Sequence, residues 1–268
     1  MSSTRASEGA LTVPEGTAGA PPHRWRWYSV LILVGIIVGL SFLLAFLFDG
    51  LPEEMGVTIV RIDGTIVSGN AFGGGFSGSE AVGREIRRAA DDPMVEAIVL
   101  RINSGGGTPA GAQEIVRDIA FARKKKPVIS SMGDMGTSAA YYIAAATDRI
   151  YANPDTLTAG VGTIWTFYDR SDLMERRGVK VDPVKSGELK DFGADYRNLT
   201  GEERDYAQQI VNESAAYLIN EITTYRHITP DMIEDARVVR GQEALKLGLI
   251  DELGNLNDAI MGAKRLAG

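Results

Sequence analysis

The chain has 268 residues, of which 24% are charged and 44% hydrophobic, proportions that are ordinary for a globular protein. Its formal net charge of −7 argues against general nucleic-acid binding, which depends on basic surfaces. The absence of cysteine excludes disulfides, cysteine nucleophiles and thiolate metal sites, and the two histidines limit every histidine-based mechanism.

The N-terminal region is predicted to hold a membrane anchor. Residues 1–27 are predicted to form a disordered cytoplasmic tail, since their first part is rich in Ser, Gly, Ala, Thr and Pro and has no periodicity. Val30–Phe48 then gives 19 residues without a charge. As a helix, that run spans roughly 28 Å, close to the thickness of a bilayer core. We therefore predict a transmembrane helix over residues 28–48. A secretory signal peptide is the alternative, but no small-residue cleavage site follows Phe48.

The charges that flank this run predict its orientation. Basic residues precede it and acidic residues follow it: Arg24 and Arg26 on one side, and Asp49, Glu53 and Glu54 on the other. The positive-inside rule places the N-terminus in the cytoplasm and the rest of the chain outside. We expect a single-pass protein of the cell membrane, with a linker over residues 49–56 and one extracytoplasmic domain over residues 57–268.

Strand-like and helical patterns alternate in the first half of this domain. The predicted strands cover residues 57–67, 95–102, 127–132 and 149–152, and the predicted helices cover residues 80–90, 110–126 and a stretch around 144–146. This alternation predicts an α/β domain with βαβ units and a mostly parallel sheet. The glycine-rich loop over residues 68–79 lacks the pattern of a phosphate-binding loop.

The second half is less regular. We expect strands over residues 156–167 and 179–184, a helix over 171–177 and a loop over 186–192. A capping box that runs from Thr200 to Glu203 opens a long helix that ends near Tyr225. Another helix is predicted over residues 229–236, and short helices around a small strand over residues 240–260.

Ser138 lies where a buried strand turns into an alanine-rich helix. At that place the amides of a helix N-terminus point outward, which suits a nucleophile that faces a developing oxyanion. A serine in the same place is also a common helix N-cap. Position alone leaves both interpretations open.

The histidines argue against a Ser-His-Asp triad. His23 is predicted on the other side of the membrane from Ser138, and His227 follows a long amphipathic helix as a surface residue. A zinc enzyme is disfavoured as well, because the chain has neither cysteine nor an HExxH motif.

A lysine base remains. Lysine is protonated at neutral pH, so it acts as a general base only where desolvation lowers its pKa. Lys190 is a candidate because it lies near Leu189 and Phe192, although the neighbouring Asp191 also fits an ordinary surface ion pair.

Several sequence blocks, in this order, resemble those of one protease family. They are LRINSGGG (100–107), MGDMGTSAAYYIA (132–144), NPDTLT (153–158), KSGELKD (185–191) and GQEA (241–244). The chain is similar over about Val57 to Ile260 to the signal peptide peptidase A family, the Ser-Lys membrane serine proteases of peptidase family S49. That resemblance implies a ClpP/crotonase-like fold behind one N-terminal transmembrane helix.

The resemblance also implies the roles of individual residues. It makes Ser138 the nucleophile and Lys190 the general base, with the backbone N–H groups of Gly105, Gly106 and Ala139 as the oxyanion hole. It implies a serine endopeptidase that needs no metal or organic cofactor and cleaves apolar peptides such as remnant signal peptides. It further implies a ring- or dome-shaped homo-oligomer on the membrane, in which a neighbouring subunit can complete each site.

Two other functions stay open at this point. One is a related membrane Ser-Lys protease that acts on membrane-protein segments. The other is a catalytically weakened, oligomeric module that binds peptides.

Two positions depart from the family pattern. Ala139-Ala140 replaces the usual Gly-Gly after the nucleophile, although alanine keeps the N–H group. Ala159–Gly162 replaces the usual Gly-Ser-Ile-Gly, so no hydroxyl is present at Gly160 to orient the lysine. Thr158, Thr163 or a water is then expected to take that place.

Overall fold

The computed structural model of the protein describes residues 23–48 and 56–268, which belong to two separate units. The predicted tail over residues 1–22 and nearly all of the predicted linker lie outside the described residues. The remaining residues of the predicted tail, 23–27, are helical.

The first unit contains helix α1 (His23–Phe48). Among the residues that the structure describes, no helix is both long enough and apolar enough to cross a membrane. The transmembrane span over residues 28–48 therefore stays a prediction from the sequence.

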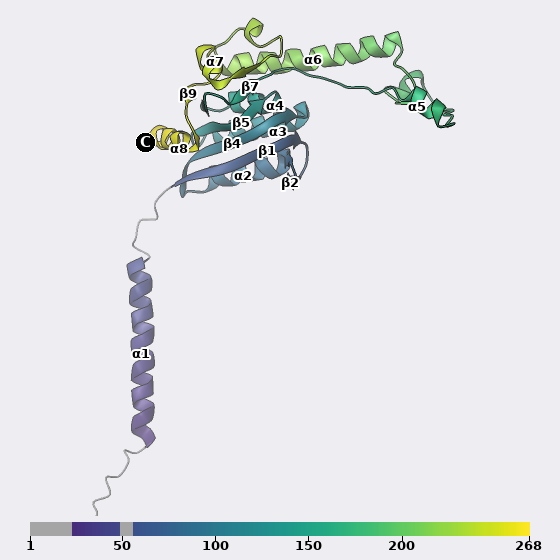
Figure 1. Cartoon of the computed structure of the whole chain (residues 1–268). Coiled ribbons are helices and arrows are strands. Elements are labelled where there is room, and N and C mark those ends of the chain that lie inside the picture. The colour runs from purple at the N-terminus through teal and green to yellow at the C-terminus, as the bar shows by residue number, and fades with distance from the viewer. Residues whose placement is uncertain (1–22, 49–55) are drawn as a thin grey trace, which may run out of the picture. The chain divides into compact units, whose positions relative to one another are not determined.

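The second unit is built on a nine-stranded, mostly parallel sheet with the order β2-β3-β1-β4-β5-β6-β9, and β7 and β8 branch from β5 (Figure 1). Within residues 56–268, only the pairs β2–β3 and β7–β8 are antiparallel. The strands are β1 (Gly56–Val67), β2 (Phe72–Gly73), β3 (Phe76–Gly78), β4 (Val95–Gly107), β5 (Val128–Thr137), β6 (Arg149–Ala152), β7 (Leu157–Ala159), β8 (Val238–Arg240) and β9 (Glu252–Leu253). The predicted α/β class and the four main strands are confirmed.

Helices cover both faces of this sheet. One face packs against α2 (Ser79–Asp91), α3 (Pro109–Ala122) and α4 (Ala139–Ala145), and the other against α8 (Leu256–Ala267). Strand β4 contributes Ile98, Leu100 and Ile102 to the first core, and Ala97 and Val99 to the second. Because successive strand residues point to opposite faces, a strand covered on both sides has an unbroken apolar run.

A long arm projects from this body. It consists of residues 163–200 and helix α6 (Gly201–Tyr225), and it carries α5 (Ser171–Arg176) at the end of α6 that lies farthest from the sheet (Figure 1). The predicted capping box is present, since the side chains of Thr200 and Glu203 each bond the other's backbone N–H. Of residues 162–202, all of which are described, none is buried.

Three predictions about the second half of the chain are corrected. The expected strand over residues 179–184 has no pairing partner in the described chain, and Val184 is fully exposed. The strand expected over residues 156–167 is limited to β7, because the chain leaves the sheet after Ala159. Residues 229–236 form only the short 3-10 helix η2 (Pro230–Met232). The short helices predicted around a small strand are confirmed, since α7 (Gly241–Lys246) precedes β9 and α8 follows it.

Candidate active site

Ser138 lies in a sharp turn between β5 and α4. Its φ and ψ angles are 56° and −125°, a combination that non-glycine residues rarely adopt. The turn is held by a hydrogen bond from the Ser138 N–H to the carbonyl of Ala159, at 2.7 Å. Such strain costs on the order of 1–3 kcal/mol and persists where the surrounding structure enforces it, often at active sites.

The side chain of Ser138 does not cap α4, although the residue occupies the N-cap position. No α4 amide donates to its hydroxyl in the described domain. Ser138 is only half-buried, so this strained turn is accessible to solvent. Of the two interpretations of this serine, side-chain capping is therefore excluded. A strained strand-to-helix turn of this kind is how α/β hydrolases expose a nucleophile.

Gly106 packs closely against Ser138. A Cβ atom added at Gly106 would lie 2.9 Å from the Ser138 Cβ and 3.2 Å from the Ala139 nitrogen. Its φ of +109° also requires glycine. Ala139 is the first residue of α4, so its N–H has no acceptor within the helix. The structure therefore brings Gly106 and the Ala139 amide together at the nucleophile.

The predicted oxyanion amides are not equivalent. The N–H of Gly106 donates to the Oγ atom of Ser104, at 3.1 Å, so this amide is already engaged. Gly105 is exposed and faces Met135, whose sulfur would lie 3.5 Å from an added Cβ. Among the three predicted donors, Ala139 has the clearest geometry for an oxyanion.

The threonines that were expected to replace the missing hydroxyl are engaged elsewhere. Thr158 is buried and donates to the carbonyl of Gly136, at 2.9 Å. Thr163 pairs with Ser214 of helix α6, with 3.0 Å between the two oxygens. Gly160 lies beside the nucleophile, since its added Cβ would be 3.9 Å from the Ser138 nitrogen.

Lys190 lies on the arm, in the 3-10 helix η1 (Glu188–Asp191), and it is exposed. Its amine has no hydrogen bond or ion pair among the described residues. The apolar niche that a lysine base requires is therefore not formed around Lys190 within one chain.

Helix α6 separates Lys190 from Ser138. Arg197 bonds both Asp191 and Glu203, which fixes η1 to the first turn of α6. Farther along α6, Glu221 accepts a bond from Tyr142 of α4 at 3.4 Å. The 18 residue steps from Glu203 to Glu221 correspond to a rise of about 27 Å at the helical 1.5 Å per residue. Figure 1 shows the same separation, with the arm's tip far from α4.

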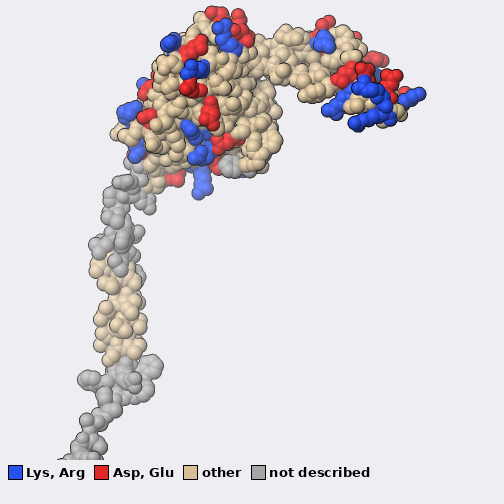
Figure 2. Space-filling view, viewed as in Figure 1, with Lys and Arg blue, Asp and Glu red and all other residues tan. Residues whose placement is uncertain are grey.

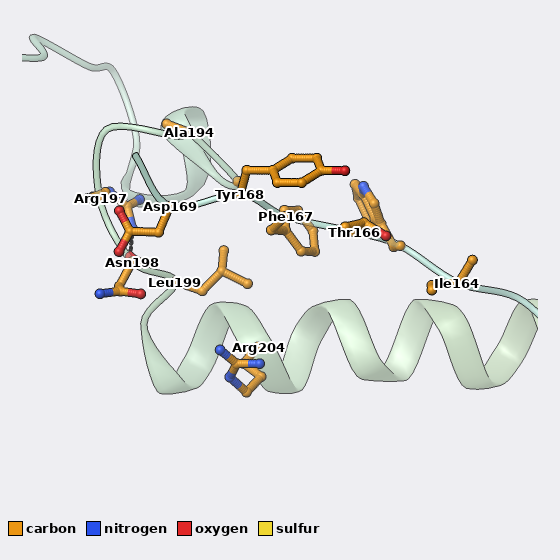
Figure 3. A pocket seen from close by; sticks show the side chains of 12 residues that line it. Ile164, Thr166, Phe167, Tyr168, Asp169, Ala194, Arg197, Asn198, Leu199 and Arg204 are labelled. Atoms are coloured by element: carbon orange, nitrogen blue, oxygen red, sulfur yellow. Dashed lines mark hydrogen bonds between the residues drawn. The ribbon is translucent and has the colours of Figure 1, made fainter. Parts of the chain in front are cut away.

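Sequence reasoning missed an aromatic cluster on the arm. Trp165, Phe167, Phe192 and Tyr206 have ring centroids 5.0–5.9 Å apart. Beside them lies a hollow of about 300 Å³, in which Phe167 and Leu199 lie toward α6 (Figure 3). The signal available in the sequence was the group of aromatic residues at Trp165, Phe167 and Tyr168.

No metal centre is formed by the side chains that the structure describes, since no three of their His, Asp or Glu residues are grouped to hold an ion. The site thus consists of the half-buried Ser138, the adjacent free N–H of Ala139 and a glycine wall formed by Gly106. These elements suit attack of a serine on a carbonyl carbon.

Comparison with known proteins finds several proteases that are similar to this chain. The sequence model described as Peptidase family S49 matches residues 120–268. Protease 4 of Salmonella typhi is 33% identical over 222 residues, which cover 81% of this chain and 36% of that protein. The chloroplastic serine protease SPPA of Arabidopsis thaliana is 30% identical over 193 residues, which cover 70% of this chain and 28% of that protein. The chain thus spans about a third of the length of these relatives.

Many solved structures have a similar fold, and one of them holds a bound peptide. It is the 1510-N membrane-bound stomatin-specific protease, in a lysine-to-alanine mutant complexed with a substrate peptide. The TM-score is 0.50 at 18% identity, over 78% of this chain and 80% of that chain. At this identity the likeness concerns the fold.

Proposed function

The chain belongs to peptidase family S49, the Ser-Lys serine proteases, and we propose that it is an endopeptidase with Ser138 as nucleophile and Lys190 as general base. The observation that carries the proposal is the strained turn, which holds an uncapped serine hydroxyl beside the first free amide of α4. A serine that served only to start the helix would bond that helix, and Ser138 does not.

The proposed reaction is acyl transfer in two steps. The Oγ atom of Ser138 attacks the scissile carbonyl while Lys190 takes its proton, and the Ala139 N–H stabilises the oxyanion. Lys190 then protonates the leaving amine, and the acyl-enzyme remains. A water that gives its proton to Lys190 hydrolyses this ester, which releases the second product and restores Ser138.

The proposed dyad combines residues of two subunits. Lys190 is carried to the far end of α6, about 27 Å along the helix from the residue that contacts α4. We therefore propose a ring- or dome-shaped homo-oligomer in which the arm of one subunit delivers Lys190 to the Ser138 of its neighbour. Contact with that neighbour would also bury the exposed lysine, as its role as a base requires.

The proposed location rests on the sequence, and the proposed substrate rests on the family. We propose that residues 28–48 anchor the protein in the cell membrane, with the protease domain outside, because 19 uncharged residues are flanked by basic and then acidic side chains. A protease held at that surface meets apolar peptides such as remnant signal peptides, which we propose as its substrates. The half-exposed Met135 and Leu157 are paired residues of β5 and β7, near the nucleophile, and offer an apolar surface for such chains.

Complementation between inactive variants tests the proposal. Full-length Ser138→Ala and Lys190→Ala proteins are each expected to lose cleavage of an apolar peptide and fluorophosphonate labelling of serine. When both are coexpressed, about a quarter of the interfaces of a random homo-oligomer combine an intact serine with an intact lysine. We expect mixed oligomers to regain about that share of wild-type activity.

The controls separate the steps of the proposal. Full activity of either variant alone would show that its residue is misassigned. Mixed oligomers that remain inactive would show that both residues must lie in one chain. If the wild-type protein neither cleaves the peptide nor reacts with the fluorophosphonate, the alternative function as a peptide-binding module would be favoured.

A further inference from the structure

The carboxylate of Asp191, the residue after Lys190, is fully occupied by other groups. Its Oδ1 atom accepts from Lys185 and Arg197, each at 2.8 Å. Its Oδ2 atom accepts from Tyr196 at 2.9 Å and from the Nε atom of Arg197 at 3.1 Å. A carboxylate offers about four acceptor sites, so none is left for the amine of Lys190.

Arg197 joins this carboxylate to a second one. Its guanidinium donates to both oxygens of Glu203, at 2.7 Å each, as well as to both oxygens of Asp191. The Glu203 side chain is 3% exposed and also accepts the N–H of Thr200 at the start of α6. Lysine cannot make two such bidentate contacts, because it is a single point charge. The contacts therefore tie the loop that carries Lys190 to a helix N-terminus.

The cluster is balanced in charge. Lys185 and Arg197 contribute two positive charges, and Asp191 and Glu203 contribute two negative charges. Figure 2 shows basic and acidic atoms gathered together at the tip of the arm. Hydrogen bonds from Arg197 and Lys185 hold the pKa of the Asp191 carboxyl far below its usual range. Lys190 is left outside the cluster with a net neighbouring charge near zero.

We propose that Lys185 and Arg197 keep the Asp191 carboxylate away from the adjacent Lys190, so that the Lys190 amine can lose its proton when it faces a nucleophile. A carboxylate free to contact a lysine stabilises the ammonium form and opposes its use as a base. Lys185 and Arg197 are thus positioning residues. The inference rests on the proposed role of Lys190.

The other charged groups near Lys190 have lesser effects. Glu188, on the same 3-10 helix, is 99% exposed and interacts with Lys185 at 3.9 Å, so water screens it. Asp195 is paired with Arg170 at 3.3 Å. Tyr196 is neutral at physiological pH and donates to Asp191, where partial desolvation and the carboxylate raise its own pKa. Asp191 is therefore the carboxylate whose release would affect Lys190 most.

The test measures the pH dependence of fluorophosphonate labelling of Ser138 in the full-length protein. Arg197→Gln should shift the acid limb of the labelling rate upward by about one pH unit, a roughly tenfold loss near neutral pH. The rate should recover at high pH. Asp191→Asn in the same chain should return the limb to its wild-type position, because the released carboxylate is gone.

Two other variants test the proposal even if the Arg197→Gln protein does not fold. Lys185→Met removes one partner of Asp191 and leaves the Arg197 contacts, so a smaller shift in the same direction is expected. Lys180→Met removes the same charge from an exposed site on the arm and should leave the limb unchanged. A loss of labelling at every pH without a shift, or a double variant that stays shifted, would overturn the proposal.

The proposed function can fail separately. If Lys190→Ala labels as fast as the wild type at every pH, Lys190 is not the base, whatever the Arg197 variants do. If Lys190→Ala abolishes labelling while Arg197→Gln leaves the limb in place, the dyad stands and the role of the cluster is refuted.

Discussion

Replacement of Gly106 by alanine is the most direct test of the glycine wall. The added Cβ would lie 2.9 Å from the Ser138 Cβ, 3.1 Å from the carbonyl oxygen of Thr137 and 3.2 Å from the Ala139 nitrogen. Two of these neighbours are backbone atoms, which cannot rotate away. The φ of +109° adds strain of about 1–3 kcal/mol for a residue with a side chain.

Two measurable losses follow from this clash. For a domain of this size, each kcal/mol lowers Tm by roughly 2–4 °C, so we expect a fall of about 2–12 °C. The methyl group also crowds the place beside the Ala139 amide where an oxyanion would lie. Loss of one oxyanion donor typically lowers kcat by about 100- to 1,000-fold. We expect a loss of that order in peptide cleavage, measured well below the Tm of the variant.

Gly105→Ala is the matched control. Its added Cβ meets only the Met135 sulfur, at 3.5 Å, an ordinary contact with a flexible side chain. Because Gly105 does not have a positive φ, alanine is tolerated there, and we expect cleavage within about threefold of wild type. Equal losses in the two variants, or a Gly106→Ala protein as active as the wild type, would refute the inferred contact between Gly106 and the nucleophile.

Three further predictions concern stability. The hydrogen bonds from Arg197 lower the pKa of Glu203 from 4.5 to about 2. The ionised Glu203 therefore stabilises the fold above pH 4.5, and this stabilisation is lost as the pH falls from 4.5 toward 2. At pH 3, hydrogen exchange should therefore rise first at the tip of the arm. Tyr141→Phe removes a buried 2.8 Å bond to the Leu249 carbonyl and should cost about 1–2 kcal/mol in denaturant unfolding, with cleavage unchanged. Ile222→Ala, at the buried end of α6, should cost about 2–5 kcal/mol, whereas the exposed Gln209→Ala should change stability by less than about 0.5 kcal/mol.

The body of the domain could be predicted because its signals are local. Apolar runs of strand length, glycine turns and helical periodicity give the βαβ order from Val57 to Ala152. The turn at Ser138 was predicted from the same pattern. Its backbone angles were not, because they depend on the hydrogen bond to Ala159, a neighbour that only the folded chain provides.

The arm was predicted less well, for a physical reason. Val179, Val181 and Val184 have strong strand propensity, which reports how well a side chain fits a paired and half-buried surface. Within one chain this segment has neither a partner strand nor a cover, so it forms no strand. The separation of Lys190 from Ser138 could likewise not be predicted from the sequence, because the order of motifs along a chain does not give the direction in which a helix projects.

The length of α6 has a consequence for the assembly. Its buried end is fixed by Leu218 and Ile222, and its outer end by the contacts of Glu203. If each arm supplies its Lys190 to a neighbouring subunit, the length of α6 sets the distance between adjacent active sites. One residue inserted in the middle of α6 would lengthen the helix by about 1.5 Å and rotate the tip of the arm by about 100°. An insertion or deletion in α6 would then move Lys190 away from the neighbouring Ser138 and reduce activity, even with the residues around Ser138 unchanged.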